Sequence, residues 1–188
     1  ETGFSHTLKF AFWNNEENGA LGSAEYVQYI ASTGADMSLY TNFDPGCYDP
    51  DGRMVLDIAS NQQSSWVANM MTACNTLYDI NFTLTYNTYT FVSDHTPFWD
   101  YGYASVTTHS ESHGPAHTPQ DTVDQVSIMY AQKNAQLGMS VIATLAEVIN
   151  DEVPEFTSAS AVLLTALAAS AAVILVSAQK KTKALKSR

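Results

Sequence analysis

Apolar and polar residues alternate along the first 149 residues in a way that predicts strands and helices in turn. The opening run HTLKFAFW, residues 6–13, is rich in apolar and aromatic residues, which is typical of a strand buried on both faces. Residues 21–32 then place apolar side chains at helical spacing. The same pattern predicts further strands over residues 35–43, 52–58, 84–92 and 103–109, and helices over residues 62–78 and about 121–149.

The alternation of strands with helices favours an α/β fold. We expect a three-layer sandwich, with helices on both faces of a mixed, mostly parallel sheet, formed by residues 1–149. No internal repeat and no long low-complexity linker interrupts this region. It is therefore expected to be one globular unit.

The C-terminal segment has a different pattern, because residues 157–178 carry no charge. At about 1.5 Å per residue, a helix of this length crosses the roughly 30 Å hydrocarbon core of a bilayer. We expect one transmembrane helix over residues 159–178, joined to the globular unit by a linker over residues 150–158. A buried, alanine-rich core helix is the alternative.

The basic tail at residues 179–188 gives the expected orientation in the membrane. By the positive-inside rule this tail is cytoplasmic, so the globular unit is extracellular or lumenal. Asn81-Phe82-Thr83 is a glycosylation sequon on the expected outer side, which indicates a glycoprotein. An exported domain needs a signal peptide, and none is present. The chain is therefore interpreted as the C-terminal part of a longer protein.

The net charge indicates which ligands the chain can attract, and the two cysteines raise the question of a disulfide. The net charge is −11, and five of the eight Lys and Arg residues lie in the last nine positions. The globular unit is therefore strongly acidic, which disfavours nucleic acid as a partner and favours ligands with a free amine. Cys47 and Cys74 match no metal-binding spacing, and we give a slight preference to a disulfide between them while leaving the free state open.

Candidate chemistry lies where the predicted strands end. Glu16 and Glu17 follow the first strand, Asp44 follows the next, and His117 precedes the last helix. Sites in α/β folds gather at strand carboxyl ends, and carboxylates with an imidazole are typical zinc ligands. Neighbouring side chains in an extended segment point in opposite directions, so one glutamate could bind a metal while the other acts as a base. The alternative is a solvated acidic turn.

Four stretches, in order, allow a comparison with a known family: FAFWNNEENGALGS, NFDPG, SDHTPFWDYGYASV and ESHGPAHTPQDTVDQV. Together they resemble the C-terminal half of the zinc exopeptidases of peptidase clan MH, which include bacterial leucyl aminopeptidase, aminopeptidase Y and glutamate carboxypeptidase. The resemblance covers about residues 7–148. It implies that residues 1–149 are the C-terminal part of a catalytic domain that hydrolyses terminal bonds of peptides, with an aminopeptidase favoured.

The resemblance also implies roles for individual residues. Glu16 would be the general base, Glu17 and His117 would bind one zinc ion, and Asp44 would bind a second. Three more residues would line the substrate pocket or support the ligands from behind: Asp94, His95 and Glu111. For His95, an internal histidine without a role in the site is an equal alternative.

One departure from the family limits this prediction. Relatives carry a His-x-Asp segment before the Glu-Glu turn, as well as an Asp that bridges both metals, and residues 1–6 contain neither. We therefore expect a membrane-anchored zinc exopeptidase whose present chain supplies three of five protein ligands and is inactive alone. A non-catalytic, receptor-like ectodomain of the same fold and a one-zinc glutaminyl cyclase are the alternatives, and the oligomeric state is open.

Overall fold

The computed structural model describes residues 4–44, 46–87, 91–146 and 173–177. Its centre is a six-stranded sheet with the order β1-β6-β2-β5-β3-β4. In that order the strands are Thr7–Ala11, Val173–Ser177, Leu39–Phe43, Ser105–Ser110, Val55–Ser60 and Thr83–Tyr86. The predicted strands before residue 111 are thus all present, with shorter bounds.

The sheet is mixed, as predicted, but it is not mostly parallel. The pairs β2–β5 and β3–β4 are parallel, whereas β1–β6, β6–β2 and β3–β5 are antiparallel. The expectation of a mostly parallel sheet was therefore wrong. Strand direction depends on which strands become neighbours, and the β3–β5 and β6 pairings join segments that are distant in the sequence.

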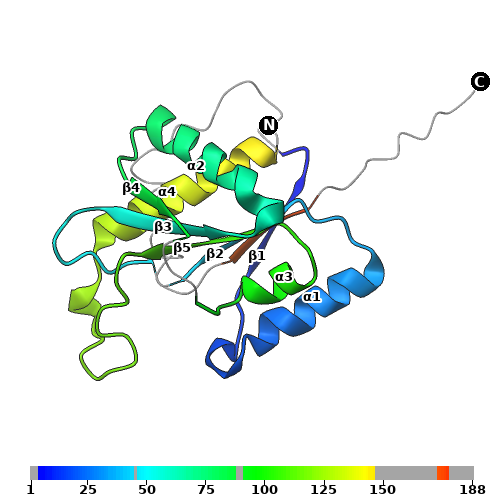
Figure 1. Cartoon of the computed structure of the whole chain (residues 1–188), viewed down its shortest axis with the longest axis horizontal. Coiled ribbons are helices and arrows are strands. Elements are labelled where there is room, and N and C mark those ends of the chain that lie inside the picture. The colour runs from blue at the N-terminus through cyan, green and yellow to red at the C-terminus, as the bar shows by residue number, and fades with distance from the viewer. Residues whose placement is uncertain (1–3, 45, 88–90, 147–172, 178–188) are drawn as a thin grey trace, which may run out of the picture.

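Helices cover both faces of the sheet and give the predicted three layers (Figure 1). Helices α2 (Ser65–Leu77) and α4 (Ile128–Leu145) lie against each other on one face. Helices α1 (Leu21–Thr33) and α3 (Thr96–Asp100) lie against each other on the other face. Short 3-10 turns η1 (Glu16–Asn18), η2 (Gln62–Ser64) and η3 (Val123–Gln125) lead into α1, α2 and α4.

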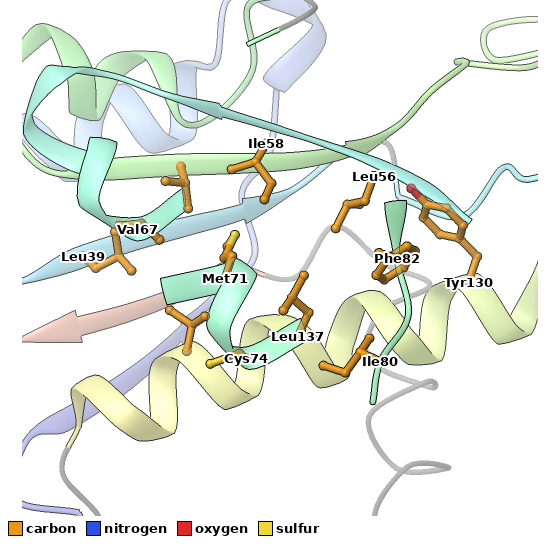
Figure 2. Packing of buried hydrophobic residues seen from close by; sticks show 12 residues of the cluster. Leu39, Leu56, Ile58, Val67, Met71, Cys74, Ile80, Phe82, Tyr130 and Leu137 are labelled. Atoms are coloured by element: carbon orange, nitrogen blue, oxygen red, sulfur yellow. The ribbon is translucent and has the colours of Figure 1, made fainter. Parts of the chain in front are cut away.

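Each face has its own hydrophobic cluster. Figure 2 shows the larger one, in which Leu56 and Ile58 of β3 face Met71 of α2 and Leu137 of α4. On the other face Tyr40 of β2 stacks on Phe98 of α3, with ring centroids 3.8 Å apart. Burial of such side chains stabilises a fold by about 1.5–3 kcal/mol each. The sheet is thereby held between two packed layers, and its strand ends are fixed.

The last helix and the first strand differ from their predictions. Helix α4 begins at Ile128 and not near residue 121, because Ser127 is its N-cap and accepts a hydrogen bond from the Tyr130 backbone N–H (3.3 Å). Strand β1 is not buried on both faces, since Phe10 is 52% exposed and Phe12, just after it, is 56% exposed. β1 is one of the two edge strands of the described sheet.

The C-terminal segment differs from the expected transmembrane helix over the residues that can be compared. Residues 173–177 form strand β6, which pairs antiparallel with β1 and with β2. Residues 147–172 and 178–188, which hold the rest of the expected helix, the linker and the basic tail, lie outside the described residues. No helix among the described residues is long and apolar enough to cross a bilayer.

The two cysteines are both free, so the slight preference for a disulfide was wrong. Cys74 belongs to α2 and is buried in the larger hydrophobic cluster (Figure 2). Cys47 belongs to the loop after β2 and lines a surface pocket. The two cysteines therefore lie in different places, one in the core and one at a pocket.

Candidate active site

Three strands deliver the candidate residues to one edge of the sheet. β1 and β2 both run antiparallel to β6, and β5 runs parallel to β2, so these three strands share one direction. Their carboxyl ends therefore lie at the same edge. Glu16 and Glu17 follow β1, Asp44 follows β2, and the loop with His117 follows β5. These residues were predicted from the sequence to follow the carboxyl ends of strands. The strand directions place those ends on the same side of the sheet.

The turn that carries Glu16 and Glu17 depends on its two glycines. Gly19 has φ 101°, a backbone conformation that strains other residues. Gly22, in the first turn of α1, has the carbonyl oxygen of Asn14 only 2.8 Å from where a Cβ would lie. The spacing Gly-x-x-Gly therefore lets the chain turn sharply from β1 into α1. This sharp turn places the two glutamates in η1 at the strand end.

Glu17 and His117 lie in contact. Glu17 Oε1 is 2.9 Å from His117 Nε2, and the two side chains are 69% and 74% exposed. His117 has φ 63°, so it occupies the left-handed region within the loop between β5 and α4. Two potential zinc ligands from distant parts of the sequence are thus brought together at a solvent-accessible position.

Glu16 has an unusual affinity for its proton. Its surroundings raise the pKa of Glu16 to about 7. Burial is the largest cause, followed by the negative charges of Asp44, Glu17 and Asp94, while His117 acts in the opposite direction. A carboxyl group with a pKa near neutrality can both take up and release a proton under physiological conditions. The site therefore contains a group suited to acid-base chemistry next to potential metal ligands.

Asp44 is held in place by hydrogen bonds to buried residues. Its backbone N–H donates to the carbonyl of Thr108 in β5 (3.2 Å), and its carboxylate Oδ2 accepts a hydrogen bond from Ser93 Oγ (2.6 Å). Ser93 in turn accepts a hydrogen bond from Asn42 Nδ2 (2.9 Å). The sequence reasoning missed Ser93 and Asn42, although Ser93 stands directly before the Asp-His pair of the third motif.

The predicted supporting residues have three different surroundings. Asp94 is buried, accepts a hydrogen bond from Ser23 Oγ (2.6 Å), and has a raised pKa because of its burial. His95 is fully buried between Phe91 and Trp99, and burial lowers the pKa of His95 to about 4. Asp94 therefore contacts α1, the helix that begins just after the Glu16–Glu17 turn. His95 contacts aromatic rings in the interior.

Glu111 lies on the surface in an ion pair. It is paired with Arg53, which also binds Asp51 (2.5 Å). A pocket of about 130 Å³ does lie between the loop after β2 and the loop after β5, but its lining does not include Glu111. Among its lining residues are Gly46, Cys47, Tyr48, His113, Pro115, Ala116 and Val126. This pocket adjoins the loops that carry Asp44 and His117.

Two side chains of the types that bind zinc converge among the described residues. Zinc in proteins takes three or four ligands from Asp, Glu, His or Cys, at about 2.0–2.3 Å. Glu17 and His117 supply two suitable atoms that converge, whereas no group of three such side chains capable of holding a metal occurs in the part of the chain that the structure describes. The pair fits one side of a zinc ion, and further ligands are needed to complete it.

Comparisons with known proteins match this chain to one family and to solved structures. Residues 1–142 match the family model described as Peptidase family M28. The Legionella pneumophila LapA aminopeptidase superimposes with a TM-score of 0.66 at 19% identity, over 73% of this chain and 38% of that one. BSAP, a zinc aminopeptidase from Bacillus subtilis, gives 0.62 at 21% identity, over 76% and 36%. The chain thus spans less than two thirds of either relative. A search of curated protein sequences found no match.

Proposed function

Because the chain belongs to peptidase family M28, we propose that it is part of a zinc-dependent aminopeptidase with Glu16 as general base. The observation that carries the proposal is the contact of Glu17 with His117 beside a glutamate whose pKa is about 7. The likeness to LapA and BSAP, which are both aminopeptidases, supports the same choice.

The proposal assigns metal ligands to three residues of this chain. Glu17 and His117 would hold one zinc ion, and Asp44 would hold a second. When bound, zinc supplies Lewis-acid activation of water and of the peptide carbonyl. The remaining protein ligands would come from outside the described residues, and the complete protein would bind two ions.

Glu16 would carry the proton during hydrolysis. Its carboxylate would accept a proton from the attacking water and then donate it to the amine that leaves when the peptide bond breaks. In the metal-free protein, burial and the neighbouring carboxylates raise the pKa of Glu16 to about 7. This pKa would fall when zinc is bound, which would leave the carboxylate ionised and able to accept the proton of the water. The acidic character of the chain, with a net charge of −11, would attract the positive amino terminus of the peptide substrate.

The test is Glu16→Gln in the full-length protein. The amide keeps the size of the side chain but cannot accept a proton, so kcat should fall about 10²–10⁴-fold while bound zinc is unchanged. Glu25→Gln is the matched control, because Glu25 is an exposed glutamate of α1 outside the site. Near-normal kcat in Glu16→Gln would overturn the assigned base. A wild-type protein that binds zinc but cleaves no peptide from its amino end would overturn the proposed activity.

We also propose that the protein is anchored in a membrane through residues 157–178. The support is the absence of charge in this stretch and the basic residues that follow it. The strand β6 and a transmembrane helix are mutually exclusive for residues 173–177. A tag after Arg188 in sealed vesicles distinguishes them. A span predicts that the tag is on the cytoplasmic side and that the protein stays with the membrane after carbonate washing, whereas release by the wash contradicts it.

A further inference from the structure

A buried row of hydrogen-bonded side chains lies beneath Asp44. Ser93 Oγ is 2.6 Å from Asp44 Oδ2 and 2.9 Å from Asn42 Nδ2, and Asn42 Nδ2 also lies 3.4 Å from Thr107 Oγ1 of β5. Ser93, Asn42 and Thr107 are each fully buried. Water therefore does not compete for these contacts, and the geometry of the row is set by the sheet.

The chemistry of the groups fixes the direction of each hydrogen bond. The amide nitrogen of Asn42 can only donate, so Ser93 accepts from it. The single hydroxyl hydrogen of Ser93 is then free to be donated to Asp44, whose carboxylate can only accept. Among the described residues, Ser93 gives the only hydrogen bond to the Asp44 side chain. Oδ2 of Asp44 is thus held by a hydrogen bond, and Oδ1 has no hydrogen bond from the described residues.

The segment that carries Ser93 is itself held on several sides. The Ser93 carbonyl accepts from the Thr96 backbone N–H (2.9 Å) at the start of α3. Its neighbour Asp94 accepts from Ser23 Oγ (2.6 Å) of α1, the helix that begins directly after the Glu16–Glu17 turn. The dipeptide Ser93-Asp94 therefore contacts the residue after β2 on one side and the helix after β1 on the other. It joins the two strand ends that carry the candidate ligands.

We infer that Ser93 is a positioning residue, which holds the carboxylate of Asp44 in the orientation needed to bind a metal ion. The inference rests on the proposed function, because Asp44 is a metal ligand only there. Hydrogen bonds from outer residues to metal-binding carboxylates restrict the ligand and raise metal affinity, and their loss typically lowers affinity or activity by 10- to 100-fold. Asn42 directs the Ser93 hydroxyl in the same way.

The experiment is a double-mutant cycle on zinc binding in the full-length protein. Zinc dissociation constants are measured by competition with a chromophoric chelator for the wild type, Ser93→Ala, Asp44→Ala and the double variant. We expect Ser93→Ala to weaken zinc binding about tenfold or more when Asp44 is present. In the Asp44→Ala background the same change should alter the affinity for the remaining zinc less than about twofold, because the hydroxyl then has no ligand to orient.

A matched control and a second variant keep the result interpretable. Ser140→Ala removes another buried hydroxyl, one that donates to the Leu137 carbonyl within α4, and should leave zinc affinity unchanged. Ser93→Thr keeps the hydroxyl and should retain affinity within about threefold. If Ser93→Ala does not fold, Asn42→Ser removes the amide that directs the hydroxyl and should weaken zinc binding in the same sense.

The outcomes separate this inference from the proposed function. Equal zinc affinity in the wild type and in Ser93→Ala, with a loss in Asp44→Ala, would overturn the role of Ser93 and leave the proposed function standing. An equal loss from Ser93→Ala in both backgrounds would also overturn it, because the effect would then be general destabilisation. A wild-type protein that binds no zinc would overturn the proposed function, and the inference with it.

Discussion

Two carboxylate–histidine pairs in this domain have similar geometry and opposite surroundings. In the first, Asp57 Oδ2 lies 3.1 Å from His109 Nε2, and both side chains are fully buried. In the second, Glu17 Oε1 lies 2.9 Å from His117 Nε2, and both side chains are largely exposed. The first pair spans the neighbouring strands β3 and β5, whereas the second joins a turn and a loop at the strand ends.

The buried pair is saturated with hydrogen bonds. Thr85 Oγ1 donates to Asp57 Oδ1 (2.6 Å), and His109 Nδ1 lies 2.9 Å from the carbonyl oxygen of Ser110. A carbonyl can only accept, so His109 Nδ1 donates to it, and Nε2 is directed at Asp57. Such a pair leaves no coordination position for a metal. The exposed pair can be approached by a ligand, which is what a binding site requires.

The largest expected effect comes from breaking the buried pair. Asp57→Ala should lower the free energy of unfolding by about 3–5 kcal/mol, because it leaves His109 and Thr85 without their buried partner. Urea unfolding of the full-length protein measures this change. His117→Ala in the metal-free protein is the control, since an exposed substitution changes stability by only about 0.5 kcal/mol or less. Similar losses in both variants would show that the two pairs do not differ as described.

His95 differs from both pairs, because it is buried and no carboxylate in the described part of the chain forms a hydrogen bond with its ring. Neither ring nitrogen of His95 has a hydrogen-bond partner among the described residues, and burial lowers the pKa of His95 to about 4. In the unfolded chain the pKa of His95 is about 6.5. Between about pH 4 and pH 6.5 the unfolded state therefore binds more protons than the folded state. Stability should therefore fall as pH decreases from about 6.5 to about 4, by up to about 3 kcal/mol.

The measurement is urea unfolding of the wild type and of His95→Phe at pH 7 and pH 5. Phe keeps an aromatic ring of similar size but does not titrate. The loss of stability between the two pH values should be smaller in His95→Phe than in the wild type. An identical pH dependence in the two proteins would contradict the assignment of this effect to His95.

The exposed pair should affect zinc binding more than stability. His117→Ala and Glu17→Ala in the full-length protein should each weaken zinc binding at least about tenfold, the lower limit seen for outer residues of metal sites. The unfolding temperature of the metal-free protein should be nearly unchanged, because both side chains lie in solvent. Equilibrium dialysis with zinc gives the affinity. Unchanged zinc binding in both variants would remove the proposed site.

The smallest effect is expected at an exposed ion pair outside the site. Glu111→Gln removes the partner of Arg53, which keeps its contact with Asp51 (2.5 Å). Exposed ion pairs are weakened by water and salt, so we expect no measurable change in unfolding temperature or in zinc affinity. A clear loss of kcat/KM with stability unchanged would instead support the predicted place of Glu111 in the substrate cleft.

The sequence by itself determined the local elements and the chemistry at their ends. The pattern of apolar residues predicted five of the strands, α1, α2 and the main part of α4, because a buried face imposes its period on neighbouring residues. The Glu16–Glu17 turn also depends on local features, since its glycines act on their own backbone. Short α3 was missed, because five residues are too few to show a helical period.

Only the tertiary structure decided which distant residues meet. The contact of Glu17 with His117, the hydrogen bond from Ser93 to Asp44, and the pairing of Asp57 with His109 each join separate segments. The strand order, including the place of β6 beside β1, was not predicted, and the predicted mostly parallel direction was wrong. Only the resemblance to a known family implied that Glu17 and His117 bind the same ion. Side-chain periodicity reports only whether a residue faces the interior. The partner it finds there depends on strand order and register, which the packing of the whole sheet determines.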